Sequence, residues 1–84
     1  MYATGRGVAQ DHAEAVRWYR LAAERGHAEA QYNLGTLYNY GEGVLEDDEE
    51  AVKWYRLSAE QGNSGGQFML GAMYFFGKGV EQNY

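Results

Sequence analysis

Apolar and small residues recur at helical spacing in two stretches near the middle of the chain. Between about Ala28 and Tyr40 they stand at Ala30, Leu34, Leu37 and Tyr38. Between Asp47 and Gln61 they stand at Ala51, Trp54, Tyr55, Ser58 and Ala59. Intervals of three and four residues place such side chains on one face of an α-helix. No segment shows sustained alternation with a period of two, so the pattern predicts an all-α chain.

Residues typical of helix ends bracket the second stretch. Asp47 is followed three residues later by Glu50, a capping-box-like spacing that recurs at Asp11. Gly62 follows the stretch, as Gly26 follows its earlier copy. Glycine suits the left-handed residue that ends many helices. We therefore expect helix starts at Asp47 and Asp11 and helix stops at Gly62 and Gly26.

The chain repeats itself at an interval of 36 residues. Tyr2 aligns with Tyr38 and Tyr74, and the Trp-Tyr-Arg-Leu run at 18–21 aligns with the same run at 54–57. A Gly-x-Gly-Val run occurs at 5–8, 41–44 and 77–80. Of the 48 residue pairs separated by 36 positions, 22 are identical. A match this extensive indicates a tandem repeat.

Each repeat is expected to be a pair of helices joined by a turn, so the sequence predicts an α/α solenoid of helix-turn-helix units. In such a fold each unit buries its apolar face on its neighbours. Residues 1–25 hold the end of a first helix and a second helix, residues 26–61 a complete unit, and residues 62–84 a first helix and its loop. The chain is thus a single repeat segment of about 2.3 units. We expect a right-handed superhelix.

The repeated blocks carry a family resemblance. A Leu-Gly-x-x-Tyr-x-x-Gly-x-Gly-Val block stands at 34–44 and again at 70–80. An acid, then Ala-x-x-Trp-Tyr and a small-residue pair, follow from Asp47 to Ala59, and the first unit shows the same features from Tyr2 through Ala23. These blocks are similar to the Sel-one-like repeat family, α/α solenoids related to tetratricopeptide repeats. The resemblance covers essentially the whole chain and implies protein–protein scaffolding, commonly as an adaptor in larger assemblies.

Composition narrows the classes of partner. The chain has 84 residues, a formal net charge of −5 and no cysteine. We do not expect nucleic acid as a partner, because binding a phosphate backbone draws on clustered Lys and Arg. No apolar run approaches the roughly 20 residues of a membrane span, and no signal peptide is visible. Membrane insertion is therefore not expected, and the sequence does not fix a compartment.

The Gly41-Glu42-Gly43 stretch admits two interpretations, a turn between helices or a loop that cradles a phosphate. The helix expected after it opens with five consecutive acids, Glu46 to Glu50, which would occupy the positive helix N-terminus and repel a phosphate. No Gly-Lys-Ser/Thr follows the glycines, and no strand precedes them. We therefore interpret the stretch as a turn, in which glycine supplies a positive φ.

No catalytic, metal or cofactor site is predicted, so we expect the segment not to be an enzyme. Consecutive acids do not wrap around an ion as a calcium loop does. His12 and His27 are the only histidines, and nothing in the sequence places either beside a nucleophile. The repeated Trp-Tyr pairs, at Trp18 and Trp54, are expected to pack between helices.

Glycines inside the expected helices point to close packing. Gly35 and Gly71 recur in register, which indicates close approach of neighbouring helices. Gly65-Gly66 departs from the repeat and should weaken the first turn of its helix. Asn63 or Ser64 is then left to cap that turn.

Positions that differ between units are the candidates for recognition, because packing positions repeat. By analogy with tetratricopeptide-type solenoids, the first helix of each unit lines the concave surface. The candidate partner-binding residues are Tyr32, Thr36, Asn39 and Tyr40, and in the same columns of the next unit Phe68, Ala72, Phe75 and Phe76. Together they form an aromatic-rich groove of the kind that anchors a peptide or helix. For Tyr32 and Phe68, a half-buried position in the repeat is an equally good interpretation.

These observations favour a scaffold or adaptor that binds a protein or peptide in a concave groove. A structural alternative is a spacer or self-associating segment, because the last helix is apolar and no polar cap is apparent. A third alternative is part of a cell-wall-related or regulatory enzyme whose catalytic residues lie elsewhere in a longer chain. The resemblance suggests this third role, but the sequence contains no catalytic motif that supports it.

Overall fold

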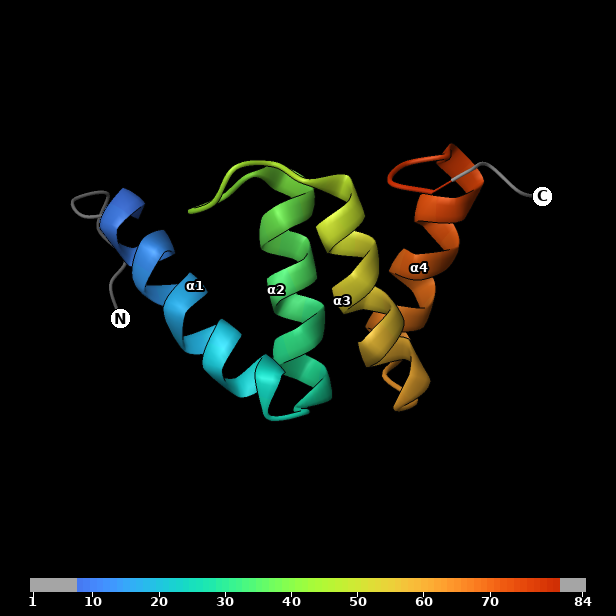
Figure 1. The fold of residues 1–84 in the computed structure, drawn as a ribbon, viewed down its shortest axis with the longest axis horizontal. Coiled ribbons are helices and arrows are strands. Elements are labelled where there is room, and N and C mark those ends of the chain that lie inside the picture. Colours follow the sequence, from blue (N-terminus) through green and yellow to red (C-terminus); the bar gives the residue numbers. More distant parts are fainter. Residues whose placement is uncertain (1–7, 81–84) are drawn as a thin grey trace.

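The computed structural model of the chain describes residues 8–80, with side chains from residue 13 onward. This part consists of four helices, α1 (Val8–Glu24), α2 (Ala28–Tyr40), α3 (Asp48–Glu60) and α4 (Ser64–Phe76). They stand in a row in chain order, with α1 at one end and α4 at the other (Figure 1). Residues 8–80 contain no strand, and the all-α solenoid prediction is confirmed. The handedness of the superhelix stays a prediction.

The ends of α2 and α3 lie where the local chemistry favours them. The Asp47 carboxylate accepts a hydrogen bond from the Glu50 backbone N–H at 3.1 Å, so the predicted N-cap is confirmed. Gly62, just past α3, has a φ of 89°, a left-handed conformation that a Cβ disfavours. The turn after α2 likewise has a positive φ at Gly41 and Gly43, 69° and 79°, which confirms the turn interpretation of this stretch.

The start of α1 differs from the prediction. The helix begins at Val8, so Asp11 lies within it and is not its N-cap. The equivalent residues of the next unit, 44–47, form the loop before α3. A hydrogen bond of 3.0 Å from the Asp47 N–H to the Tyr38 carbonyl fixes that loop to α2. The equivalent acceptor for α1, Tyr2, lies outside the described residues.

Two apolar clusters form the core. The first joins Val16 and Ala23 of α1, Ala30, Leu34 and Leu37 of α2, and Trp54 of α3. The second joins Ala51, Val52 and Tyr55 of α3 with Met73 of α4. Leu34, Ala51 and Tyr55 have no exposed surface. Each cluster spans helices from successive units, and such contacts between neighbours supply much of the stability of a solenoid.

The two tryptophans of the repeated Trp-Tyr pair have different environments. Trp54 is 5% exposed and belongs to the first cluster, as predicted. Trp18 is 64% exposed, so the prediction that it packs between helices is wrong in this structure. Two helices precede α3 and cover Trp54, whereas the described residues contain no helix before α1.

Polar contacts between the second helix of one unit and the first helix of the next recur along the row. Arg20 donates a hydrogen bond to the Tyr38 hydroxyl, and Arg56 donates one to the Tyr74 hydroxyl at 2.5 Å. Each guanidinium also lies over the tyrosine ring, 5.7 Å and 5.6 Å from its centroid. This contact explains why arginine belongs to the repeated Trp-Tyr-Arg-Leu run.

Helical glycines mark the closest contacts between helices. A Cβ at Gly35 would lie 2.9 Å from the Tyr55 ring, and a Cβ at Gly66 would lie 2.6 Å from Ser58 Oγ. The predicted close approach is therefore confirmed for Gly35 and wrong for Gly71, where an added Cβ would meet nothing within 4 Å. The Asn63 side chain accepts a hydrogen bond from the Gly66 N–H at 2.8 Å, so the glycine-rich first turn of α4 is capped by Asn63.

Candidate functional site

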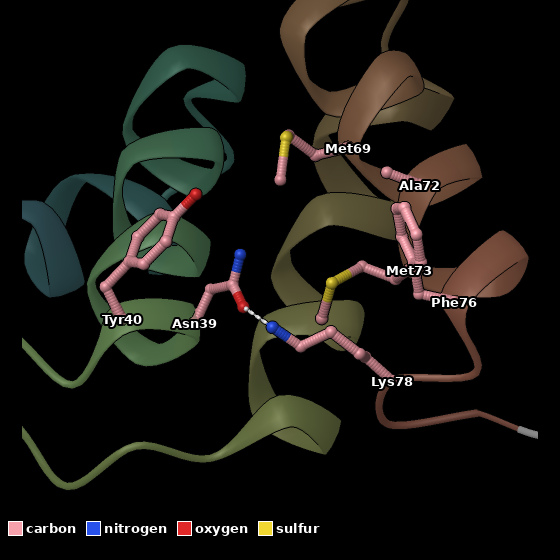
Figure 2. Close-up of a pocket in the computed structure, with 7 residues that line it drawn as sticks. All are labelled: Asn39, Tyr40, Met69, Ala72, Met73, Phe76 and Lys78. Atoms are coloured by element: carbon pink, nitrogen blue, oxygen red, sulfur yellow. Dashed lines mark hydrogen bonds between the residues drawn. The ribbon is translucent and has the colours of Figure 1, made fainter.

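The first helices of two successive units, α2 and α4, border a pocket (Figure 2). Its lining consists of Asn39 and Tyr40 from α2, Met69, Ala72, Met73 and Phe76 from α4, and Lys78 from the turn after α4. Its volume is about 160 Å³. Pockets for small molecules and cofactors usually measure roughly 300–1,000 Å³. The pocket is thus of a size to hold one side chain.

Four of the eight predicted partner-binding residues line this pocket: Asn39, Tyr40, Ala72 and Phe76. Tyr40 and Phe76 hold the same column of the repeat, and their side chains are 62% and 66% exposed. Figure 2 shows them on opposite sides of the pocket, one on each helix. The structure thus brings two exposed aromatic rings from successive units to one site.

Two predicted residues of α2, Tyr32 and Thr36, contact α3 and do not line the pocket. The ring centroids of Tyr32 and Tyr55 are 5.9 Å apart. Thr36 Oγ1 lies 3.0 Å from the Tyr55 hydroxyl. Both side chains are half-buried, which for Tyr32 agrees with the half-buried interpretation.

The remaining two predicted residues, Phe68 and Phe75, lie on α4 outside the pocket lining. Phe68 is 74% exposed, so the half-buried interpretation does not describe it in this structure. Phe75 is 56% exposed and packs edge-to-face on Phe76, with ring centroids 5.0 Å apart. Phe75 therefore supports the pocket ring of Phe76 from outside.

Asn39 departs from its expected exposure, because it is only 4% exposed. Its Oδ1 accepts a hydrogen bond from Lys78 Nζ at 3.0 Å, and its side chain also hydrogen-bonds Tyr55. Thr36 Oγ1 donates its single proton to the Tyr32 carbonyl at 3.1 Å, so the Tyr55 hydroxyl is the donor toward Thr36. A directed series of hydrogen bonds thus runs from the Lys78 ammonium into the interface between α2 and α3.

Tyr55 is the centre of that series. Burial raises the pKa of the Tyr55 phenol above its ordinary value, although its hydrogen bond with Asn39 acts in the opposite direction. The phenol is therefore neutral at physiological pH. Its role is to hold α2 on α3 and to fix Asn39 at the pocket.

Lys78 is the only charged residue among the seven that line the pocket. One of its three N–H donors is used by Asn39. The others can reach a carboxylate of a bound group. An apolar cavity with one ammonium at its edge suits an apolar side chain that has an acidic neighbour.

Sequence reasoning missed three lining residues, Met69, Met73 and Lys78. The sequence does carry a signal for Lys78. Its position in the repeat is occupied by Glu42 one unit earlier, so the charge reverses between units, as expected of a recognition position. Met73 shares its column with Leu37, so the sequence indicates a core residue. In the structure Met73 is indeed only 2% exposed. Its contribution to the pocket is visible only in the folded chain.

Other kinds of site find no support in the described part of the chain. Among the side chains that the structure describes, those of residues 13–80, no three from His, Asp or Glu gather where they could hold a metal ion. None of the described helices is long and apolar enough to cross a membrane.

Comparison with known protein families gives one match over the whole chain. The model of the Sel1 repeat matches three times, at residues 1–27, 28–63 and 64–84. No curated protein matches the chain.

Two solved structures resemble the chain closely. One is the crystal structure of c5321, a protective antigen present in uropathogenic Escherichia coli strains that displays an SLR fold; it is 52% identical, with a TM-score of 0.88 over 95% of this chain. The other is a Sel1 repeat protein from Oxalobacter formigenes, 43% identical, with a TM-score of 0.83 over 86% of this chain. The chain spans 17% and 30% of the lengths of these two proteins.

Proposed function

The chain belongs to the Sel1 repeat family, and from that premise we propose that it anchors a peptide or helix of a partner protein on the face formed by α2 and α4. Sel1 repeat proteins are commonly protein-interaction scaffolds. The observation that carries the proposal is the pocket between the exposed rings of Tyr40 and Phe76. Exposed aromatic anchors and adaptable methionine side chains are typical of protein-binding surfaces.

The lining of the pocket supports a proposal for the chemistry of the partner. Met69, Met73 and Phe76 offer an apolar cavity with space for one side chain, and Lys78 offers a positive charge at its edge. The partner segment therefore carries a large apolar residue with an acidic residue close to it. This is a binding role, and no catalytic step is assigned to the segment.

A selection experiment tests this proposal. A random peptide library displayed on phage is selected on the immobilised 84-residue chain, and enriched peptides are titrated against the Tyr40→Ala/Phe76→Ala double variant. We expect peptides with a large apolar residue beside an acidic one. The double variant should bind them at least about tenfold more weakly, because truncating anchor residues removes on the order of 1–2 kcal/mol each. Both rings are mostly exposed, so the far-ultraviolet circular dichroism should not change.

Phe68→Ala is the matched control, since it removes an exposed phenylalanine of α4 that does not line the pocket. Its peptide affinity should equal that of the parent chain. Equal binding by the double variant, or the absence of any enriched peptide, contradicts the proposal. A loss of helical signal in the double variant would instead show that Tyr40 and Phe76 are core residues.

A further inference from the structure

The last helix, α4, exposes a face that its counterpart α2 buries. Gly35 is buried on α2, whereas Gly71 in the same column of α4 is exposed. Tyr32 is half-buried on α2, whereas Phe68 in its column is 74% exposed. The difference arises from one neighbour, because α3 covers this face of α2 and no described helix follows α4.

The contact between α2 and α3 shows what this face accommodates. The Tyr55 ring lies so close to Gly35 that an added Cβ would be 2.9 Å from it. At Gly71 an added Cβ would meet nothing within 4 Å. Gly71 and Phe68 therefore border an open groove on α4. On α2 the residues in the same columns, Gly35 and Tyr32, receive the Tyr55 ring.

The other end of the row, α1, exposes the matching face of a second helix. Trp18 is 64% exposed, whereas Trp54 in its column on α3 is 5% exposed. An open cleft of about 230 Å³ lies on this side, lined by Trp18, Leu21, Ala22, Arg25 and His27. Tyr19 holds the column of Tyr55, and it is only half-buried where Tyr55 is fully buried. α1 thus carries the residues that α3 uses to cover a first helix.

We propose that a second copy of this chain docks its α1 on α4, head to tail, and completes between two molecules the helix pair that α2 and α3 form within one. Tyr19 of the second copy then lies over Gly71, as Tyr55 lies over Gly35. Its Trp18 enters the angle between α3 and α4, as Trp54 enters the angle between α1 and α2.

Two further observations agree with this arrangement. Leu34, beside Trp54, has no exposed surface, whereas Leu70 in its column remains half-buried and can gain cover from Trp18. Gln61, the residue just after α3, also donates a hydrogen bond from its Nε2 to Gln31 Oε1 of α2 at 2.9 Å. In the docked pair, Arg25 of the second copy takes the place of Gln61, and Gln67 of the first copy takes the place of Gln31. The Arg25 guanidinium then faces the Gln67 side-chain oxygen as a hydrogen-bond donor.

The interface uses two different surfaces, and this property makes it testable. A contact of this kind leaves a free α4 at one end of the pair and a free α1 at the other, so it propagates into open chains. A variant blocked on α4 and a variant blocked on α1 each retain one working surface. Mixed together, they should pair once and stop.

The experiment compares Gly71→Gln, Trp18→Gln and the parent chain by sedimentation velocity over a range of concentrations. The parent chain should form dimers and larger oligomers as its concentration rises. Each variant alone should associate at least tenfold more weakly, and their equimolar mixture should give a 1:1 heterodimer that grows no further. Both positions are exposed, and Gly71 has free space around it, so the variants should keep their helical signal. Phe68→Gln, on the same face of α4, should behave like Gly71→Gln.

Leu45→Gln is the matched control, because Leu45 is 90% exposed in the loop between α2 and α3, away from both faces. It should associate like the parent chain. The proposal is overturned by a parent chain that stays monomeric, by self-association of Trp18→Gln equal to that of the parent, or by an equal loss in Leu45→Gln. The second result would indicate pairing of α4 with α4, and the third would indicate non-specific hydrophobic association. None of these results depends on peptide binding at the Tyr40–Phe76 pocket.

Discussion

Ser58 and Gly66 illustrate how a single contact adjusts between units of the repeat. Ser58 Oγ donates a hydrogen bond to the Ala28 carbonyl at 2.8 Å and leaves no space for a Cβ at Gly66. One unit earlier the same two columns hold Ala22 and Ala30. The larger side chain on the second helix is thus matched by a smaller one on the first helix that follows it. This match explains the glycine at position 66, which the sequence alone left unexplained.

This match predicts a coupled pair of substitutions. Gly66→Ala should destabilise the chain by about 1–3 kcal/mol through overpacking against Ser58, although alanine is the better helix former. Adding Ser58→Ala should recover part of that loss, because it removes the contact with Ser58 Oγ at 2.6 Å but leaves the Cβ of residue 58 and the Ala59 backbone N in place. Urea unfolding of the two single variants and the double variant measures the coupling free energy. Strictly additive effects would show that the two side chains do not compete for space.

At the scale of elements, the interface between α2 and α3 depends on the buried phenol of Tyr55. Its hydroxyl hydrogen-bonds Thr36 and Asn39, and its ring packs on Gly35. The Asn39 amide then reaches Lys78 in the turn after α4. One side chain thus ties together two helices and the turn that borders the candidate binding pocket.

The raised pKa of Tyr55 predicts a loss of stability at alkaline pH. Below the ordinary tyrosine pKa of about 10 both the folded and the unfolded chain hold the proton, so stability does not depend on this group. Above that pH the unfolded chain releases the proton first, and the free energy of unfolding falls as the pH rises toward the folded-state pKa. Urea unfolding at pH values on both sides of 10 measures this fall.

Tyr55→Phe separates this effect from those of the other tyrosines. The variant should be less stable at neutral pH by about 0.5–1.5 kcal/mol, because it lacks the hydrogen bonds to Thr36 and Asn39. It should lose less stability than the parent chain on moving to alkaline pH. Parallel pH profiles for the two proteins would contradict the assignment.

At the scale of the whole molecule, the four helices form a row (Figure 1), and packing is most extensive between helices that are neighbours in it. The inner helices α2 and α3 have a packed helix on each side, whereas α1 and α4 have one on a single side among the described residues. In such arrays stability is close to a sum of local and nearest-neighbour contributions.

Hydrogen exchange tests this gradient. Amides of α2 and α3 should be the most protected and those of α1 and α4 the least, because end helices can open without unfolding the rest. The Trp18→Gln variant is suited to the measurement, since its self-association is expected to be weak. Uniform protection across all four helices would instead indicate one cooperative unit.

The sequence by itself determined the helices and their repetition. The bounds expected for α2, and the cap and stop of α3 at Asp47 and Gly62, agree with the structure because helical periodicity and capping involve residues close together in the chain. Four lining residues of the pocket were also found from columns that differ between units, namely Asn39, Tyr40, Ala72 and Phe76.

The tertiary structure decided which of these residues are covered. Trp18 and Trp54 each begin the repeated Trp-Tyr-Arg-Leu run, yet only Trp54 is buried, because burial depends on which helices stand beside a residue. Asn39 lies in a variable column and is nevertheless buried, because Tyr55 and Lys78 reach it from elements distant in the chain. Such contacts join residues separated by tens of positions, and only the packing of the folded helices brings those residues together.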